Sequence, residues 1–144
     1  MNEIVPLISS SVVGPLGIAH LPRLWLKILL HAAGRLPEGY RYGTGGFDER
    51  LCERLGIDRD AFVAYIQTER PAYRALETWV AAHATAMTPH AIAAWNRLVT
   101  GARLPEAMAA ERYERFELTE ADNVMGVGLN DLDDWDALHA SLAT

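Results

Sequence analysis

Three polar side chains recur at every fourth position of an apolar stretch near the amino-terminal end. Arg23, Lys27 and His31 would line one edge of a helix at successive turns, because residues four apart lie one above the other. Charged groups on an otherwise apolar helix need a partner. That partner is either a carboxylate of the chain, such as Asp48, Asp58 or one from the acidic tail, or an anionic ligand in a pocket. Pairing within the chain is the commoner arrangement for buried charges.

The pocket alternative gives each of these groups a chemical role. Arg23 and Lys27 would hold an anionic group of a small molecule, because cations beside apolar walls attract negative charge strongly. Asp48 or His31 would move a proton, since carboxylates and imidazoles are the usual acids and bases of enzymes. The sequence therefore predicts a small-molecule binding protein, or a cofactor-free enzyme that uses acid/base chemistry.

Aromatic residues supply further candidates for ligand contact. Residues 38–47 hold four glycines and two tyrosines without a helical or alternating period, which predicts a structured loop. Tyr40 and Tyr42 in this loop would form walls of the pocket. A Trp on an apolar helix face usually belongs to the core, and Asn96 beside Trp95 indicates a polar contact. We therefore predict that Tyr40, Tyr42, Trp95 and Asn96 bind the ligand.

No metal or cofactor site is predicted. The five histidines lack the helical pairing of a zinc site, and the single Cys52 supplies too few thiolates. The acidic run at residues 130–136 lacks the glycine and the final glutamate of a calcium loop. The glycines at residues 43–46 lack the Lys-Ser or Lys-Thr of a nucleotide-binding loop, and those at 126–128 are not expected to open a long helix.

The charge balance disfavours two classes of partner. Nineteen acidic and 13 basic side chains give a net charge of -6, which repels nucleic acid and anionic lipid. Glycines, prolines and basic residues interrupt the apolar stretch at residues 12–30, so neither a signal peptide nor a membrane span is predicted. Cys52 cannot form an internal disulfide, which fits a reducing compartment. We expect a cytoplasmic protein that binds neither nucleic acid nor membranes.

Length and patterning predict a mainly α, compact single domain over residues 1–144. A chain of this size with 50% hydrophobic residues suits one core. Apolar residues surround the segment 22–34, which predicts a central helix packed on several sides. About six helices are expected, after an irregular lead-in at residues 1–20 and before an acidic extension at residues 117–144.

Capping residues predict where several helices begin. Asp48 and Asp58 each precede a helical pattern and carry a side chain that can accept a backbone N–H, and Thr88 with Pro89 marks where another helical pattern starts. A last short helix is expected over residues 131–142, with aspartates in its first turn where the helix dipole favours them.

A non-catalytic interaction module is the alternative function. The acidic carboxy-terminal helix would present Trp135 as an aromatic anchor to another protein or to another copy of the chain. A cleft that encloses Arg23, Lys27 and Asp48 would favour the small-molecule class. An exposed apolar patch without a cleft would favour the interaction module.

Five segments of the sequence carry a family resemblance. They read, in order, LPRLWLKILLHAAGRLP, FDERL, LGIDRDAF, ETWV and IAAWNRL. This order resembles the bacterial family named domain of unknown function 5069, over about residues 14–100. The matching positions are Arg23, Lys27, Tyr42, Asp48, Gly56, Phe62, Trp79, Trp95 and Asn96.

The resemblance implies a compact helical fold and no particular reaction. It directs attention to Arg23, Lys27 and Asp48 as site residues. The chain departs from the family pattern at Leu26, where the family tends to carry an acidic residue. It also departs at residues 45–47, where the family has a Cys-Pro-Leu loop end.

Overall fold

The computed structural model describes residues 2–143 and contains seven α-helices in that range. They are α1 (Leu21–Ala32), α2 (Gly46–Leu55), α3 (Arg59–Glu69), α4 (Tyr73–His83), α5 (Pro89–Gly101), α6 (Glu106–Arg115) and α7 (Gly126–Leu142), with a 3-10 turn η1 (Glu120–Asp122) before α7. The described residues form no strand beyond one isolated bridge between Val13 and Ala19. The prediction of a mainly α fold is confirmed.

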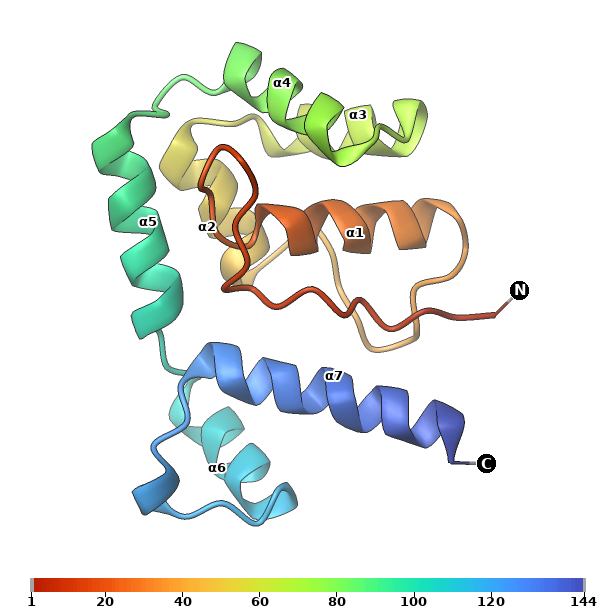
Figure 1. The fold of residues 1–144 in the computed structure, drawn as a ribbon, viewed down its shortest axis with the longest axis vertical. Coiled ribbons are helices and arrows are strands. Elements are labelled where there is room, and N and C mark those ends of the chain that lie inside the picture. The colour runs from red at the N-terminus through yellow and green to blue at the C-terminus, as the bar shows by residue number, and fades with distance from the viewer. Residues whose placement is uncertain (1, 144) are drawn as a thin grey trace.

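The helices surround α1 on three sides (Figure 1). The pair α3 and α4 packs along one side of α1, and α5 runs past α2 at one end of the bundle. The hairpin of α6 and α7 lies on the opposite side from α3 and α4. The irregular lead-in passes between α1 and α7, so α1 is central, as predicted.

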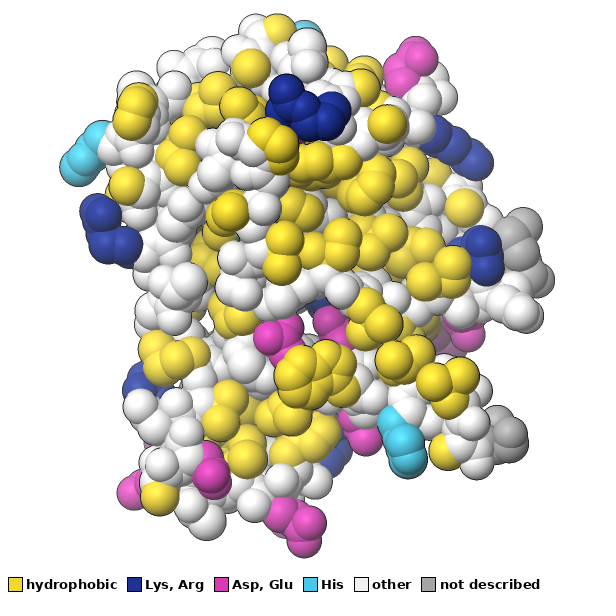
Figure 2. Space-filling model, in the orientation of Figure 1, with side chains coloured by type: hydrophobic (Ala, Val, Ile, Leu, Met, Phe, Trp, Pro, Cys, Tyr) yellow, Lys and Arg dark blue, Asp and Glu magenta, His cyan; other side chains and the backbone are white. Residues whose placement is uncertain are grey.

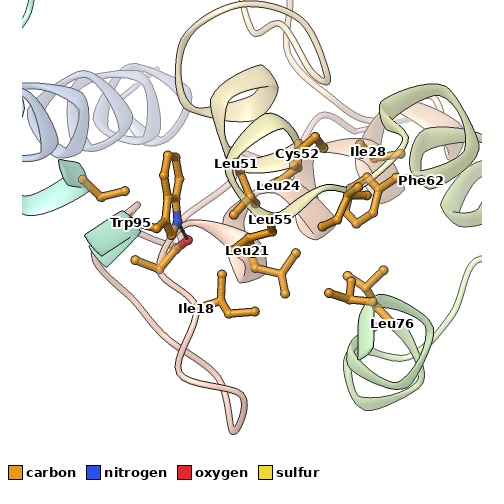
Figure 3. Packing of buried hydrophobic residues seen from close by; sticks show 14 of the residues in the cluster. Ile18, Leu21, Leu24, Ile28, Leu51, Cys52, Leu55, Phe62, Leu76 and Trp95 are labelled. Carbon is orange, nitrogen blue, oxygen red and sulfur yellow. Dashed lines mark hydrogen bonds between the residues drawn. The ribbon is translucent and has the colours of Figure 1, made fainter. Parts of the chain in front are cut away.

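The hydrophobic core lies between α1 and the helices α2 to α5. From α1, Leu21, Leu24 and Ile28 are fully buried, and they meet Leu51 and Leu55 of α2 (Figure 3). The spacing of three and then four residues between Leu21, Leu24 and Ile28 places them on one face of α1. Leu30 is buried as well, whereas Trp25, Leu26 and Leu29 are half-buried.

Of the two predicted helix caps, the one at Asp58 is confirmed, and Thr88 caps the helix whose start it was expected to mark. Asp58 accepts the N–H of Ala61 at 3.1 Å and begins α3, and Thr88 accepts the N–H of Ala91 at 3.1 Å and begins α5. The prediction that Asp48 caps a helix is wrong. Helix α2 begins two residues earlier, at Gly46, and the carboxylate of Asp48 is turned toward α1 instead.

The last helix is longer than the sequence predicts. It begins at Gly126 and runs for 17 residues, so the expectation that residues 126–128 do not open a long helix is wrong. The N–H of Gly126 donates to the carbonyl of Ala102 at 2.9 Å, and a Cβ at Gly126 would lie 3.1 Å from that oxygen. Close docking on the end of α5 thus outweighs the low helix propensity of glycine.

None of the helices in residues 2–143 has the combination of length and apolar character that crossing a bilayer requires.

Candidate functional site

A cleft of about 1040 Å³ lies between the body of the protein and the hairpin of α6 and α7. Helix α1, the loop before α2 and the start of α2 line one side, and α6, α7 and residues 102–105 line the other. Seven of the chain's 13 basic side chains line it, namely Arg23, Lys27, Arg41, Arg50, Arg103, Arg112 and Arg115. Only five of its 19 acidic side chains do so, namely Glu38, Asp48, Asp133, Asp134 and Asp136. The lining is therefore net positive in a protein whose net charge is -6.

A buried cluster of ionisable groups forms the floor of this cleft. Lys27 Nζ lies 3.0 and 2.9 Å from the two carboxylate oxygens of Asp48, and His20 Nε2 lies 2.6 Å from Asp48 Oδ1. The backbone N–H of Gly43 donates to Asp48 Oδ2 at 2.8 Å. His20, Lys27 and Asp48 are each less than a tenth exposed. One carboxylate thus accepts three hydrogen bonds away from bulk water.

The far nitrogen of the His20 ring extends this cluster into the lead-in. His20 Nδ1 lies 2.9 Å from Ser10 Oγ, and both side chains are buried at the edge of the cleft. An ionised carboxylate can only accept a hydrogen bond, so Asp48 requires a proton on His20 Nε2 when the ring is neutral. The neutral ring then presents an unprotonated Nδ1 to the hydroxyl of Ser10.

His20 holds this position with an unusual backbone conformation. It is the residue before α1 and has φ 71°, in the left-handed region that few residues other than glycine adopt. This conformation turns the chain from the lead-in into α1 while the imidazole points back at Asp48. Strained residues of this kind tend to cluster at functional sites.

Burial and pairing shift the proton affinities in this cluster. Burial lowers the pKa of His20 below its usual 6.5, although Asp48 acts in the opposite direction. Burial likewise lowers the pKa of Lys27. For Asp48, burial opposes ionisation, but the hydrogen bond from His20 and the charge of Lys27 outweigh it and lower the pKa to about 2. Near neutral pH the cluster therefore holds an ionised Asp48 and a neutral His20.

Arg23 forms the second buried ion pair of the cleft. Its guanidinium lies 2.6 Å from Asp134 Oδ2 and 3.2 Å from Asp134 Oδ1, a bidentate pair between α1 and α7. It also donates to the carbonyls of Pro6 and Ile8 in the lead-in, at 2.8 and 2.9 Å. Tyr40 donates to Asp134 at 2.8 Å, and burial together with this carboxylate raises the pKa of Tyr40. One arginine thus joins the lead-in, α1 and α7.

The structure brings four of the predicted site residues together. Arg23, Lys27, Tyr40 and Asp48 all line the cleft. Both cations also have carboxylate partners within the chain, Asp48 and the acidic carboxy-terminal segment, as the pairing alternative predicted.

Two other predicted residues lie outside the cleft. His31 is exposed, and its ring contacts that of Tyr42 with centroids 4.1 Å apart and planes tilted by 35°. Both line a separate pocket of about 510 Å³ that also borders α3. Arg23 and Lys27 of α1 line the cleft, but the cleft does not extend along α1 as far as His31.

Trp95 and Asn96 also lie outside the cleft and hold the end of the lead-in. Trp95 Nε1 donates to the carbonyl of Ala19 at 2.8 Å, the contact dashed in Figure 3. Asn96 donates to the carbonyl of Gly17 at 2.7 Å and accepts the N–H of Ala19 at 2.9 Å. In the structure these two residues position the segment directly before His20.

Sequence reasoning missed His20, Ser10 and Asp134. A signal for His20 was present, because residues 20, 23 and 27 have the 3-4 spacing of one helix face. Ser10 and Asp134 carry no comparable signal, since the fold alone brings them next to His20 and Arg23. Within residues 2–143, no three His, Cys, Asp or Glu side chains gather closely enough to hold a metal ion.

Comparison with known families agrees with this geometry. A family model described as a domain of unknown function, DUF5069, matches residues 7–135. The match covers most of the chain, so the protein belongs to this family, as the resemblance predicted. It extends beyond the predicted residues 14–100 and includes both Ser10 and Asp134. No curated protein matches the chain in sequence.

Proposed function

We propose that the cleft binds a small anionic molecule, and that the buried cluster at its floor performs acid/base chemistry on it without a cofactor. The observation that carries this proposal is the concentration of charge. More than half of the basic side chains line one cleft of a protein that is acidic as a whole. A concave site with such a lining attracts anions even when the whole molecule repels them.

Three of the cleft arginines have no carboxylate partner among the described residues. Arg41 and Arg50 form no ion pair there, and Arg103 donates to the amide oxygen of Asn123. The guanidinium of Arg41 lies beside Gly45 and Gly46, at the start of α2. These groups supply the positive charge that a phosphate or carboxylate would need, because Lys27 and Arg23 are already neutralised.

The acid/base part of the proposal rests on His20 and Asp48. A neutral imidazole with one unprotonated nitrogen can accept a proton from a reacting group, and an ionised carboxylate on the other nitrogen stabilises the imidazolium that forms transiently. His20 therefore takes the role that the sequence suggested for His31, and Asp48 supports it.

Ligand binding can be tested by thermal shift with phosphate, sulfate and small dicarboxylates. An anion that binds only the folded protein raises its Tm by mass action. The rise should be lost in Arg50→Gln and kept in Arg54→Gln, which removes the same charge one turn further along α2 and outside the cleft. No response to any anion in the parent, or equal losses in both variants, would contradict the proposal.

The interaction module remains a second candidate because several large apolar side chains are exposed. Trp135 on α7 is 59% exposed, and Ile4, Leu7, Val12 and Val13 of the lead-in are also exposed. Figure 2 shows hydrophobic side chains gathered across the middle of one face of the molecule. A second copy of the chain, or another protein, is the proposed partner. Light scattering of the parent and of Trp135→Ser would detect self-association as a change in mass.

For the location of the protein we propose the cytoplasm of a bacterium. The single Cys52 is buried and its pKa is raised to about 12 by burial, so the thiol stays protonated and unreactive.

A further inference from the structure

We propose that Ser10 is a nucleophile, activated by His20, and that the protein hydrolyses carboxylic esters that carry an anionic group. This inference rests on the proposed function, because the cleft arginines would hold the anionic group. The observation that carries it is the continuous hydrogen-bonded line from Ser10 Oγ through His20 to Asp48, with distances of 2.9 and 2.6 Å. Three separate segments, the lead-in, the residue before α1 and the first turn of α2, converge to form it.

The direction of proton transfer follows from the partners of His20. Asp48 is also bound by Lys27 and Gly43, so it remains an acceptor and keeps the proton on His20 Nε2. The lone pair on Nδ1 therefore faces the Ser10 hydroxyl, which donates to it. Serine, imidazole and carboxylate have the same relation in the Ser-His-Asp triad of hydrolases, which is recognised by geometry and roles. Here Nδ1 faces the serine and Nε2 the carboxylate, the reverse of the usual triad.

The arrangement reduces stability in ways that a scaffold does not require. His20 has a left-handed backbone that glycine would adopt more readily, and its fully buried ring replaces what could be apolar packing. Features of this kind persist where the chemistry of the side chain matters. They favour a reactive role for the line over a purely structural one.

Arg23 fixes the segment that carries the nucleophile. It donates to the carbonyls of Pro6 and Ile8, four and two residues before Ser10, and is itself fixed by Asp134. Ser10 is only 2% exposed, yet it borders the cleft. A small ester in the cleft would thus meet a hydroxyl whose position and hydrogen bond are already set.

The reaction balances with water as the other reactant. Ser10 Oγ attacks the ester carbonyl carbon while its proton moves to His20 Nδ1, and the bond from that carbon to the alcohol oxygen breaks as the alcohol takes the proton. Water then attacks the acyl-serine, gives a proton to His20 and releases the acid, and that proton returns to Ser10. Asp48 stabilises the imidazolium in both halves.

A small alkyl fluorophosphonate tests the nucleophile directly. It forms a bond from phosphorus to an activated serine oxygen and releases fluoride, so intact mass and peptide mapping identify the residue that reacts. We expect one adduct on Ser10 in the parent and in Ser11→Ala, and none in Ser10→Ala. His20→Gln should slow labelling by about 100-fold or more, the usual contribution of a general base. Circular dichroism checks that each variant is folded.

The substrate class is tested by comparing two esters of one alcohol, p-nitrophenyl hemisuccinate and p-nitrophenyl acetate. The folded parent should hydrolyse the anionic ester with the higher kcat/KM, and Arg50→Gln should reduce this preference while Arg54→Gln retains it. Equal hydrolysis of both esters by the parent would overturn the assigned substrate class.

Failure of this inference is distinguishable from failure of the proposed function. If the folded parent gains no adduct on Ser10 but anions still raise its Tm, the nucleophile is ruled out and the binding site stands. An adduct on Ser10 without any response to anions would overturn the binding site and keep the nucleophile. Unchanged labelling in a folded His20→Gln variant would overturn the assignment of His20 as base.

Discussion

Asp48 connects three parts of the protein through one carboxylate. Its two oxygens accept hydrogen bonds from His20, from Lys27 of α1 and from the N–H of Gly43 in the loop. A buried carboxylate is tolerated only when such partners compensate for lost hydration. Removing it would leave the ammonium of Lys27 in the same buried place without its counter-charge.

Replacing Asp48 with asparagine should therefore lower the free energy of unfolding by about 3–5 kcal/mol, the usual cost of an orphaned buried charge. Urea denaturation near neutral pH measures this loss. Asp60→Asn is the matched control, because Asp60 is exposed in its pair with Arg59 and should change stability by less than about 0.5 kcal/mol. Adding Lys27→Met to Asp48→Asn should recover part of the loss. A single variant as stable as the parent would contradict the ion-pair interpretation.

The cluster also predicts how stability changes with pH. The folded protein keeps His20 neutral, with its pKa lowered from 6.5, whereas the unfolded chain takes up a proton at the ordinary value. The groups that face the ring are Ser10 from the lead-in, Asp48 from α2, and Lys27 and Arg23 from α1. The free energy of unfolding should therefore decrease as the pH falls below 6.5.

A second loss should follow in acid, because the pKa of Asp48 is lowered from 3.8 to about 2. Its contribution is fully present above the unfolded value and disappears as the pH falls through the folded value. Urea titrations at several pH values measure both steps. In His20→Gln the decrease in the free energy of unfolding below pH 6.5 should be much smaller, since the other four histidines are exposed. If His20→Gln loses as much stability below pH 6.5 as the parent, another group causes that loss.

At the scale of single residues, the sequence predicts the charged residues of the site better than its uncharged ones. Arg23, Lys27 and Asp48 stand out because charges in apolar surroundings require partners. Ser10 shows no such signal, because a serine in an irregular segment is ordinary in any protein. Its role depends on a tertiary contact with His20 that no local pattern encodes.

Among the elements, the lead-in depends most on tertiary contacts. It has one isolated bridge and no helix, and Asn96 of α5 fixes its end through the carbonyl of Gly17 and the N–H of Ala19. Trp95 holds the carbonyl of Ala19 from the same helix. Helix α5 thus determines where the chain enters α1, and with it the position of His20.

Asn96→Ala should lower the free energy of unfolding by about 1–3 kcal/mol, because two part-buried backbone groups lose their partner. The variant should also lose part of the Tm response to anions, since the segment that carries His20 is loosened. Arg97→Ala is the control, because this neighbour is exposed and outside the cleft. Thermal shift with and without phosphate measures both effects. An Asn96→Ala variant with parental stability would show that the lead-in is held by other contacts.

The elements themselves were predictable where the signal is local. Asp58 and Thr88 cap the helices that follow them, because a cap depends on only three or four consecutive residues. The starts of α2 and α7 were not predicted, since both begin at glycines that local propensity disfavours in helices. Contacts with distant residues decide these two starts, as the docking of Gly126 on Ala102 shows.

For the molecule as a whole, Asp134 connects the hairpin of α6 and α7 to the body. It binds Arg23 and Tyr40, and the lead-in adds a bond from Ser9 to Asp131. Apart from these bonds, α7 meets the body mainly at its start, beside the end of α5. The cleft lies between the two parts, so its width depends on these few polar contacts.

Asp134→Asn should loosen the hairpin without unfolding the core. Hydrogen exchange should become faster in α6, α7 and the lead-in, while α1, α3 and α4 keep their protection, because local opening depends on local contacts. Asp136→Asn is the control on the same helix, since Asp136 is exposed and its ion pair with Arg115 spans 3.5 Å. Uniformly faster exchange in all helices would show that the hairpin and the body unfold as one unit.

The four tryptophans lie on four different helices, so tryptophan fluorescence can report on the hairpin and on the body separately. There is one each on α1, α4, α5 and α7, namely Trp25, Trp79, Trp95 and Trp135. Trp95 is fully buried beside the entry to α1, whereas Trp135 is 59% exposed and directly follows Asp134. A variant that keeps only Trp95 should emit in the blue and resist quenching by iodide, and one that keeps only Trp135 should emit further to the red and be quenched readily. Ligand-induced closure of the cleft would then change the second signal while leaving the first unaltered.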